Sequence, residues 1–150
     1  GSLRGMGLLP IDTVFRPSKT TTQTRGMLLE IDGVLSDLSG LAVECYEIHM
    51  GETVRDASAK PLVRLLRREG EIEDGCQTEN AFGTYLHGVF DAPKAALRTA
   101  QALAKKKGVT LTGEALDTHA YKEQQYDKLA DSVRKSLNME WIYRIMEGKA

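Results

Sequence analysis

The chain has 150 residues, a length typical of one compact domain. Its 20 Lys and Arg against 21 Asp and Glu leave a formal net charge of −1, which argues against an electrostatic nucleic-acid binder because such proteins carry a basic excess. No apolar run approaches the roughly 18–20 residues that span a bilayer, so we expect no membrane partner. Two cysteines and an N-terminus without an apolar signal segment predict a reducing, cytoplasmic setting.

The first half of the chain has the patterns of strands and loops. Apolar or β-branched runs predict extended segments, in chain order, at residues 7–11, 19–24, 27–31 and 41–50. Asp32-Gly33 predicts a tight turn after the third segment, and Gly51 is expected to end the fourth. The strand expected at 41–50 places Cys45, Glu47 and His49 on one face, because strand side chains alternate.

The next stretch is less regular. Residues 60–68 have an apolar repeat that includes Pro61, so a strand and a short helix both remain open. Residues 71–75 have the charge and the glycine of a turn. Residues 82–90 predict a strand in which Gly83 and Gly88 mark close backbone approaches.

From Asp91 the apolar period becomes helical. Asp91 is expected to cap a helix with Pro93 in its first turn and Gly108 at its end. Apolar residues three and four apart around Tyr126 predict a second helix, and Asn138 is expected to cap a last short one. We therefore expect an α/β or α+β fold, with strands in the first half and packing helices at the C-terminus.

The three histidines are the first candidates for chemistry at neutral pH. His87 follows an apolar strand and precedes a glycine, where a rigid strand can aim a catalytic group into a cleft. The alternative is a buried structural histidine whose ring nitrogens are satisfied locally. His119 precedes a helix and is expected to be an exposed loop or first-turn residue.

Glu47 and His49 form a second candidate pair, two residues apart on one face of a strand. A carboxylate beside an imidazole can orient that ring or a neighbouring group. The alternative is a polar pair on a solvated sheet face.

Neither cysteine has the surroundings of a nucleophile. Cys45 lies between Glu44 and Tyr46 inside a strand and is expected to be a small apolar filler, whereas a strained nucleophile turn needs small neighbours. Cys76 is expected in a loop with no helix after it. The sequence contains no CxxC or HExxH spacing, so we expect no metal site.

Four separated motifs resemble the C-terminal glutamine amidotransferase domain of the cobyric acid synthase family. In this chain they are Gly5-Met6-Gly7-Leu8-Leu9-Pro10, Lys19-Thr20-Thr21, Tyr46-Glu47-Ile48-His49-Met50-Gly51 and Gly83-Thr84-Tyr85-Leu86-His87-Gly88-Val89-Phe90-Asp91. Their order and spacing agree with the family, and the ending from Tyr126 to Ile142 also resembles its C-terminus. The resemblance implies the C-terminal part of a class I glutamine amidotransferase-like, flavodoxin-like three-layer α/β domain.

The resemblance implies an activity for a longer polypeptide. Members of the family amidate side-chain carboxylates of a corrin ring in cobalamin biosynthesis, with glutamine as the nitrogen source. ATP and magnesium are expected in an N-terminal synthetase domain of the same polypeptide, and no cofactor is expected in this chain. The family's catalytic histidine, the base that keeps a cysteine as thiolate, corresponds to His87. Tyr46, Glu47 and His49 are expected to line or support that site.

Two departures from the family pattern matter. Many class I amidotransferases place Glu two residues after the histidine, where this chain has Val89. The nucleophilic cysteine precedes the Gly-Leu-Leu-Pro motif in the family, so residues 1–150 are expected to be a partial domain without the first strands and the nucleophile. We therefore expect the chain alone to be inactive, and either to self-associate through exposed surface or to repack locally. A subunit completed by a partner chain and a non-catalytic binding or scaffold domain remain as alternatives.

Overall fold

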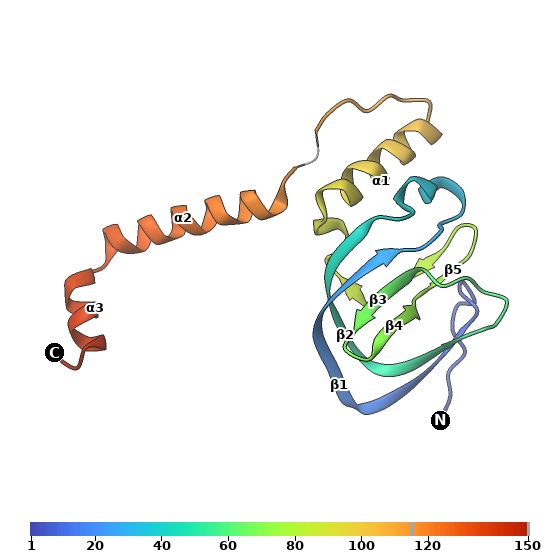
Figure 1. Cartoon of the computed structure of the whole chain (residues 1–150), viewed down its shortest axis with the longest axis horizontal. Coiled ribbons are helices and arrows are strands. Elements are labelled where there is room, and N and C mark those ends of the chain that lie inside the picture. Colours follow the sequence, from blue (N-terminus) through green and yellow to red (C-terminus); the bar gives the residue numbers. More distant parts are fainter. Residues whose placement is uncertain (115, 150) are drawn as a thin grey trace. The chain divides into compact units, whose positions relative to one another are not determined.

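The computed structural model describes residues 1–114 and 116–149, which divide into two compact units, residues 1–115 and residues 116–150 (Figure 1). The first unit contains the sheets and α1 (Pro93–Lys106). The second contains α2 (Thr118–Ser136) and α3 (Met139–Met146).

A five-stranded sheet organises the first unit, in the order β4-β3-β1-β2-β7. Its strands are β1 (Ile11–Leu28), β2 (Ala42–Arg55), β3 (Val63–Arg67), β4 (Gly70–Asp74) and β7 (Leu86–His87). The long strands β1 and β2 curve beside each other through most of their length (Figure 1). Every pairing among the described strands is antiparallel.

Smaller elements surround the sheet. A second, two-stranded sheet pairs β5 (Cys76–Gln77) with β6 (Phe82–Gly83). The 3-10 helices are η1 (Gly33–Leu38) and η2 (Val89–Asp91), and α1 packs against both of them.

One face of the large sheet is buried because alternate side chains of three strands point to the same side. That face is apolar where Val43, Cys45, Val63 and Leu65 meet, each at most 2% exposed. Farther along β2 the same alternation buries Glu47. The hydrophobic core therefore continues directly into a buried polar region, which is where the candidate site begins.

The second unit consists of two capped helices. The side chain of Asp117 accepts a hydrogen bond from the Ala120 amide at the start of α2, and Asn138 does the same for Trp141 at the start of α3. These bonds satisfy amides that have no partner inside the helix, which explains both helix starts. No residue of α2 or α3 is buried.

Two strands run further than their patterns indicate. Residues 19–24 and only Met27 and Leu28 of 27–31 belong to the single strand β1, and residues 7–10 lie before it. The expectation that Gly51 ends a strand is wrong, because β2 passes through Gly51, which pairs with Phe15. Asp32-Gly33 leads into η1 instead of forming a tight hairpin turn. For β1 and β2, cross-strand partners that are distant in sequence decide where the strand pairing stops.

The structure decides one open alternative and corrects two predictions in the stretch that follows. Residues 60–68, left open, contain strand β3. The turn predicted at 71–75 is wrong, because β4 pairs with β3 there and Arg64 lies 3.6 Å from carboxylate oxygens of both Glu71 and Glu73. The continuous strand predicted at 82–90 is also wrong, since β6, β7 and η2 divide it. Gly88 has φ +91°, which turns the chain directly after His87.

The helical half is largely confirmed. Pro93 starts α1, Gly108 follows its end, and Asn138 caps α3. The cap predicted at Asp91 is wrong, because Asp91 belongs to η2 and Ala92 holds the N-cap position. The expected mixed α/β class is confirmed. Among the described residues, no helix is both long and apolar enough to cross a membrane.

Candidate functional site

His87 lies at the end of the shortest strand of the large sheet, on its edge. β7 has two residues, and His87 pairs with Tyr46 of β2. The His87 side chain is exposed, so the alternative of a buried structural histidine is wrong. An exposed imidazole on a sheet edge is accessible to a reacting group brought by another segment or molecule.

A pocket of about 490 Å³ extends from His87 toward the hydrophobic core. Its wall is mostly apolar. The lining residues are Leu28, Ile31, Leu35, Leu38, Leu62, Phe82, Thr84, Leu86, His87, Gly88, Val89, Phe90 and Asp91. The turn at Gly88 places two of its titratable groups, His87 and Asp91, four residues apart on one rim.

Glu47 and His49 form the pair that their spacing predicts. His49 Nε2 lies 3.0 Å from Glu47 Oε1, and the other carboxylate oxygen of Glu47 accepts a short hydrogen bond from Arg67. Glu47 is 7% exposed, so the alternative of a solvated surface pair is wrong. A buried carboxylate needs partners to offset its lost hydration, and Glu47 has one on β2 and one on β3.

The ring of His49 has an acceptor at each nitrogen. Nδ1 lies 2.7 Å from the Gly51 carbonyl oxygen, and Nε2 faces Glu47. These two contacts fix the orientation of the His49 ring between Glu47 and the backbone of β2.

The sheet separates the predicted site residues into two groups. Tyr46 and His87 are directly opposite partners and share one face, whereas Glu47 pairs with Leu86 on the other face with His49. Tyr46 is exposed, and His49 is half-buried. The structure thus brings together Tyr46 with His87 and Glu47 with His49, but it does not place the second pair against the His87 ring.

Two residues at the site were missed by the sequence analysis. Tyr85 stacks on His49 with ring centroids 4.6 Å apart, and Arg67 binds both Glu47 and, through a 3.1 Å bond, the Thr24 hydroxyl. Arg67 had a local signal, because the alternation from Val63 and Leu65 puts it on the buried face. Tyr85 had none, since only tertiary pairing shows that it faces His49.

Both cysteines are free thiols, and both are buried. Burial raises the pKa of the Cys45 thiol, and the Asp91 carboxylate raises it further. Burial also raises the pKa of Cys76, although the nearby Arg55 acts in the opposite direction. Cys76 lies in β5 and not in the predicted loop. Thiols held protonated and covered are poor nucleophiles, which agrees with the expectation that neither is catalytic.

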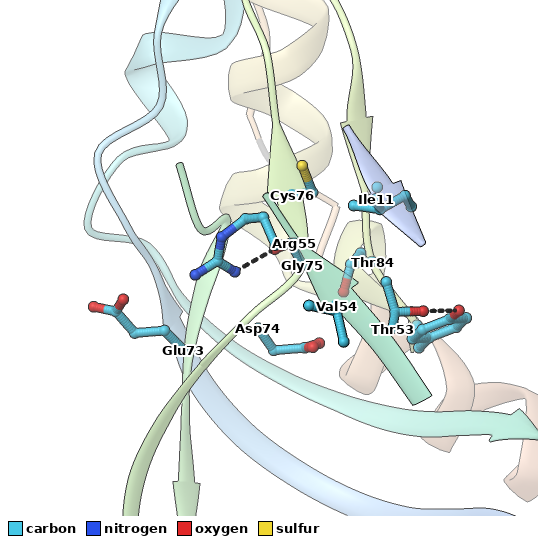
Figure 2. Close-up of a pocket in the computed structure, with 11 residues that line it drawn as sticks. Ile11, Thr53, Val54, Arg55, Glu73, Asp74, Gly75, Cys76 and Thr84 are labelled. Carbon is cyan, nitrogen blue, oxygen red and sulfur yellow. Dashed lines mark hydrogen bonds between the residues drawn. The ribbon is translucent and has the colours of Figure 1, made fainter. Parts of the chain in front are cut away.

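A second pocket, also about 490 Å³, lies where the end of β2 meets the β4–β5 connection (Figure 2). Arg55 donates a 2.9 Å hydrogen bond to the Gly75 carbonyl, and in Figure 2 its guanidinium points away from the Asp74 carboxylate. Thr53 is hydrogen-bonded to the Tyr85 hydroxyl at 2.6 Å. Tyr85 therefore contributes to this pocket while it contacts His49.

The described part of the chain contains no cluster of side chains suited to bind a metal ion. Within residues 1–114 and 116–149, no three His, Cys, Asp or Glu side chains are grouped so that they could hold a metal ion. His119, an exposed residue of the first turn of α2, lies as expected.

Comparisons with known proteins agree with the motif resemblance. Residues 1–95 match the family described as the CobB/CobQ-like glutamine amidotransferase domain. Proteins named cobyric acid synthase are similar along nearly the whole chain. That of Citrobacter koseri is 43% identical over 150 residues, that of Thermoanaerobacter sp. 39% over 151, and that of Ruminiclostridium cellulolyticum 41% over 152. These alignments cover 97–98% of this chain but 30% of each relative, so the chain spans about three-tenths of their length.

Proposed function

Because the chain belongs to the CobB/CobQ-like glutamine amidotransferase domain family, we propose that it is the C-terminal amidotransferase part of a cobyric acid synthase. The observation that carries the proposal is similarity at about 40% identity along nearly the whole chain to proteins of that name. The four separated motifs lie within the matched length, so the similarity is not confined to one segment.

The proposed reaction has two halves. Glutamine is hydrolysed in the amidotransferase domain, and the released ammonia displaces an activated oxygen from side-chain carboxylates of a corrin ring. ATP and magnesium act in an N-terminal synthetase domain of the same polypeptide, where ATP supplies the activation of the carboxylate. This chain contributes to the first half only.

We assign His87 the role of general base and acid in glutamine hydrolysis. His87 takes the proton of a cysteine thiol supplied from outside residues 1–150, and the thiolate sulfur attacks the side-chain amide carbon of glutamine. The tetrahedral intermediate breaks its C–N bond, His87 returns the proton to the leaving nitrogen, and ammonia leaves a thioester. Water then attacks the thioester with His87 as base, which yields glutamate and regenerates the thiol.

Three features of the structure support this role. The His87 ring is exposed on a sheet edge, where a thiol from another segment has access. It lines a mostly apolar pocket large enough for a small ligand. Cys45 and Cys76 are covered and have raised pKa values, so they do not compete for the role of nucleophile.

The test uses a polypeptide extended toward the N-terminus by the residues encoded upstream. We expect His87→Ala to lower glutamate release and glutamine-supported amidation by about 10²–10⁴-fold, the usual range for lost general acid–base help. Amidation supported by added ammonium should be unchanged, because it bypasses glutamine hydrolysis. The matched control is His119→Ala, which alters an exposed histidine in α2 and should leave both activities intact.

Other outcomes would contradict the proposal. Glutamine hydrolysis that survives His87→Ala would remove His87 from the mechanism. Glutamate release by the 150-residue chain alone would show that an outside cysteine is not needed. An extended polypeptide without any glutaminase activity would favour the non-catalytic binding domain.

A further inference from the structure

We propose that Tyr85 is a positioning residue that holds the edge strand of His87 against the partly buried group formed by Glu47, His49 and Arg67. The inference rests on the proposed function insofar as it concerns the glutaminase reaction. The geometric part, that Tyr85 fixes the place of His87, stands on the contacts alone.

The strand that carries His87 has little hydrogen bonding of its own. β7 is two residues long, lies at the edge of the sheet and pairs with β2 at two positions. Gly88, which follows at once, has positive φ and leads into the 3-10 helix η2. A strand this short on an edge opens easily unless side chains hold it.

Tyr85 is held at three points next to that strand. Its carbonyl oxygen accepts a 3.3 Å hydrogen bond from the Ile48 amide of β2. Its ring stacks on His49 with 24° between the planes, and its hydroxyl is 2.6 Å from the Thr53 hydroxyl. Thr53 in turn lies 2.7 Å from the Thr13 hydroxyl, so the chain of hydroxyls ends on β1.

The stacking partner of Tyr85 is itself immobilised. His49 is hydrogen-bonded at both ring nitrogens, to Glu47 and to the Gly51 carbonyl. Glu47 also binds Arg67, which reaches the Thr24 hydroxyl. Three strands, β1, β2 and β3, thus fix one imidazole ring, and that ring supports Tyr85.

The register of β2 and β7 places Glu47 and His49 on the face opposite His87. They do not hydrogen-bond the His87 ring, so their effect passes through Tyr85 and the two residues that follow it in the chain. Outer groups that orient a functional histidine commonly act in this indirect way. The Tyr-Glu-Ile-His segment of β2 is accordingly a support for β7.

The first experiment measures geometry in the 150-residue chain by NMR. Tyr85→Leu removes the stack and the hydroxyl, and we expect it to raise amide hydrogen exchange at His87 by about tenfold or more and to shift the His87 ring signals. Tyr85→Phe keeps the stack and should stay close to the parent chain. Tyr126→Leu, an exposed tyrosine of α2, is the matched control and should change neither readout.

A second pair of variants covers the case in which Tyr85→Leu fails to fold. His49→Phe keeps an aromatic ring against Tyr85, whereas His49→Leu does not, and both lose the bonds to Glu47. We expect His87 exchange to be faster in His49→Leu than in His49→Phe, with the Leu65 amide of β3 reporting the intact core in both. Equal exchange at His87 in the two variants would overturn the inference.

The second experiment measures catalysis in the extended polypeptide. Tyr85→Leu should lower kcat for glutamine hydrolysis by about tenfold with little change in KM, since it displaces the base and leaves substrate binding intact. A change confined to KM would show that Tyr85 contacts the ligand and would overturn the positioning role. Unaltered His87 exchange and ring signals in Tyr85→Leu would also overturn the positioning role of Tyr85. That result would not bear on the proposed role of His87 in glutamine hydrolysis, so the failure of one proposal can be told from the failure of the other.

Discussion

Cys45 illustrates at the residue scale how the surroundings of a side chain suppress its chemistry. Its thiol lies in the core, where the thiolate would lose its hydration, and the Asp91 carboxylate adds repulsion. Both effects raise the pKa of the thiol above its value in an unfolded chain. The same residue type in an exposed, electropositive position would be a nucleophile.

The raised pKa of Cys45 makes stability depend on pH in the alkaline range. Below about pH 8.5 the thiol is protonated in folded and unfolded chains and contributes no pH dependence. Above that value the unfolded chain loses the proton first, so the unfolded state is favoured and the free energy of unfolding falls. We expect urea unfolding at pH 7.5 and pH 10 to show this fall, with a smaller fall in Cys45→Ala.

The difference between the two chains in how far the free energy of unfolding falls from pH 7.5 to pH 10 isolates the effect of the thiol. Cys45→Ala also leaves a small cavity, but the cavity lowers stability equally at both pH values. An identical fall in the two chains would contradict the assignment of a raised pKa to Cys45.

At the scale of elements, close approach between strands depends on Gly26, near the C-terminal end of β1. Gly26 pairs with Val43 of β2 and Leu65 of β3. A Cβ at this position would lie 2.5 Å from the Arg64 carbonyl oxygen and 2.9 Å from a methyl carbon of Leu65. The first atom belongs to the backbone of β3, so relief requires the strands to separate.

Gly26→Ala is therefore expected to lower the free energy of unfolding by about 1–3 kcal/mol, the usual cost of an overpacked interior. Urea denaturation at neutral pH measures the change. Gly5→Ala is the matched control, because nothing lies within 4 Å of a Cβ at Gly5, and its midpoint should be that of the parent chain. Equal midpoints for the two variants would show that β1 and β3 can move apart freely.

At the scale of the whole molecule, burial is confined to the first unit. Every buried residue of the described chain lies between Thr24 and Ala102, and neither α2 nor α3 contributes one. Each helix of the second unit begins at a capping side chain, Asp117 for α2 and Asn138 for α3. The core cluster of the sheet consists of residues of the first unit.

A chain that ends at residue 114 is accordingly expected to keep its sheet. Amide signals of β1, β2 and β3 in a ¹H–¹⁵N spectrum should hold their positions, while helical far-UV circular dichroism falls with the loss of α2 and α3. Collapse of signal dispersion in the shortened chain would show that the sheet needs the second unit. A midpoint of thermal unfolding close to that of the parent chain is the second check.

The sequence alone determined the features that depend on neighbours in the chain. Helix starts at Asp117 and Asn138 follow from side chains that bond amides three residues away, and Pro93 and Gly108 bracket α1 for equally local reasons. The family resemblance rested on four local motifs, and the Glu47–His49 pair followed from the two-residue period of a strand. His87 is a candidate for an equally local reason, because it follows an apolar strand and precedes a glycine.

Only the tertiary structure decided which faces and partners these residues have. The antiparallel register puts His87 opposite Tyr46 and turns Glu47 and His49 to the other face, where Arg67 and Tyr85 meet them. The charges of β4, which indicated a turn, pair instead with Arg64 on β3. Register is set by contacts between strands far apart in sequence and by the burial of one sheet face, and a shift of one residue would exchange the two faces.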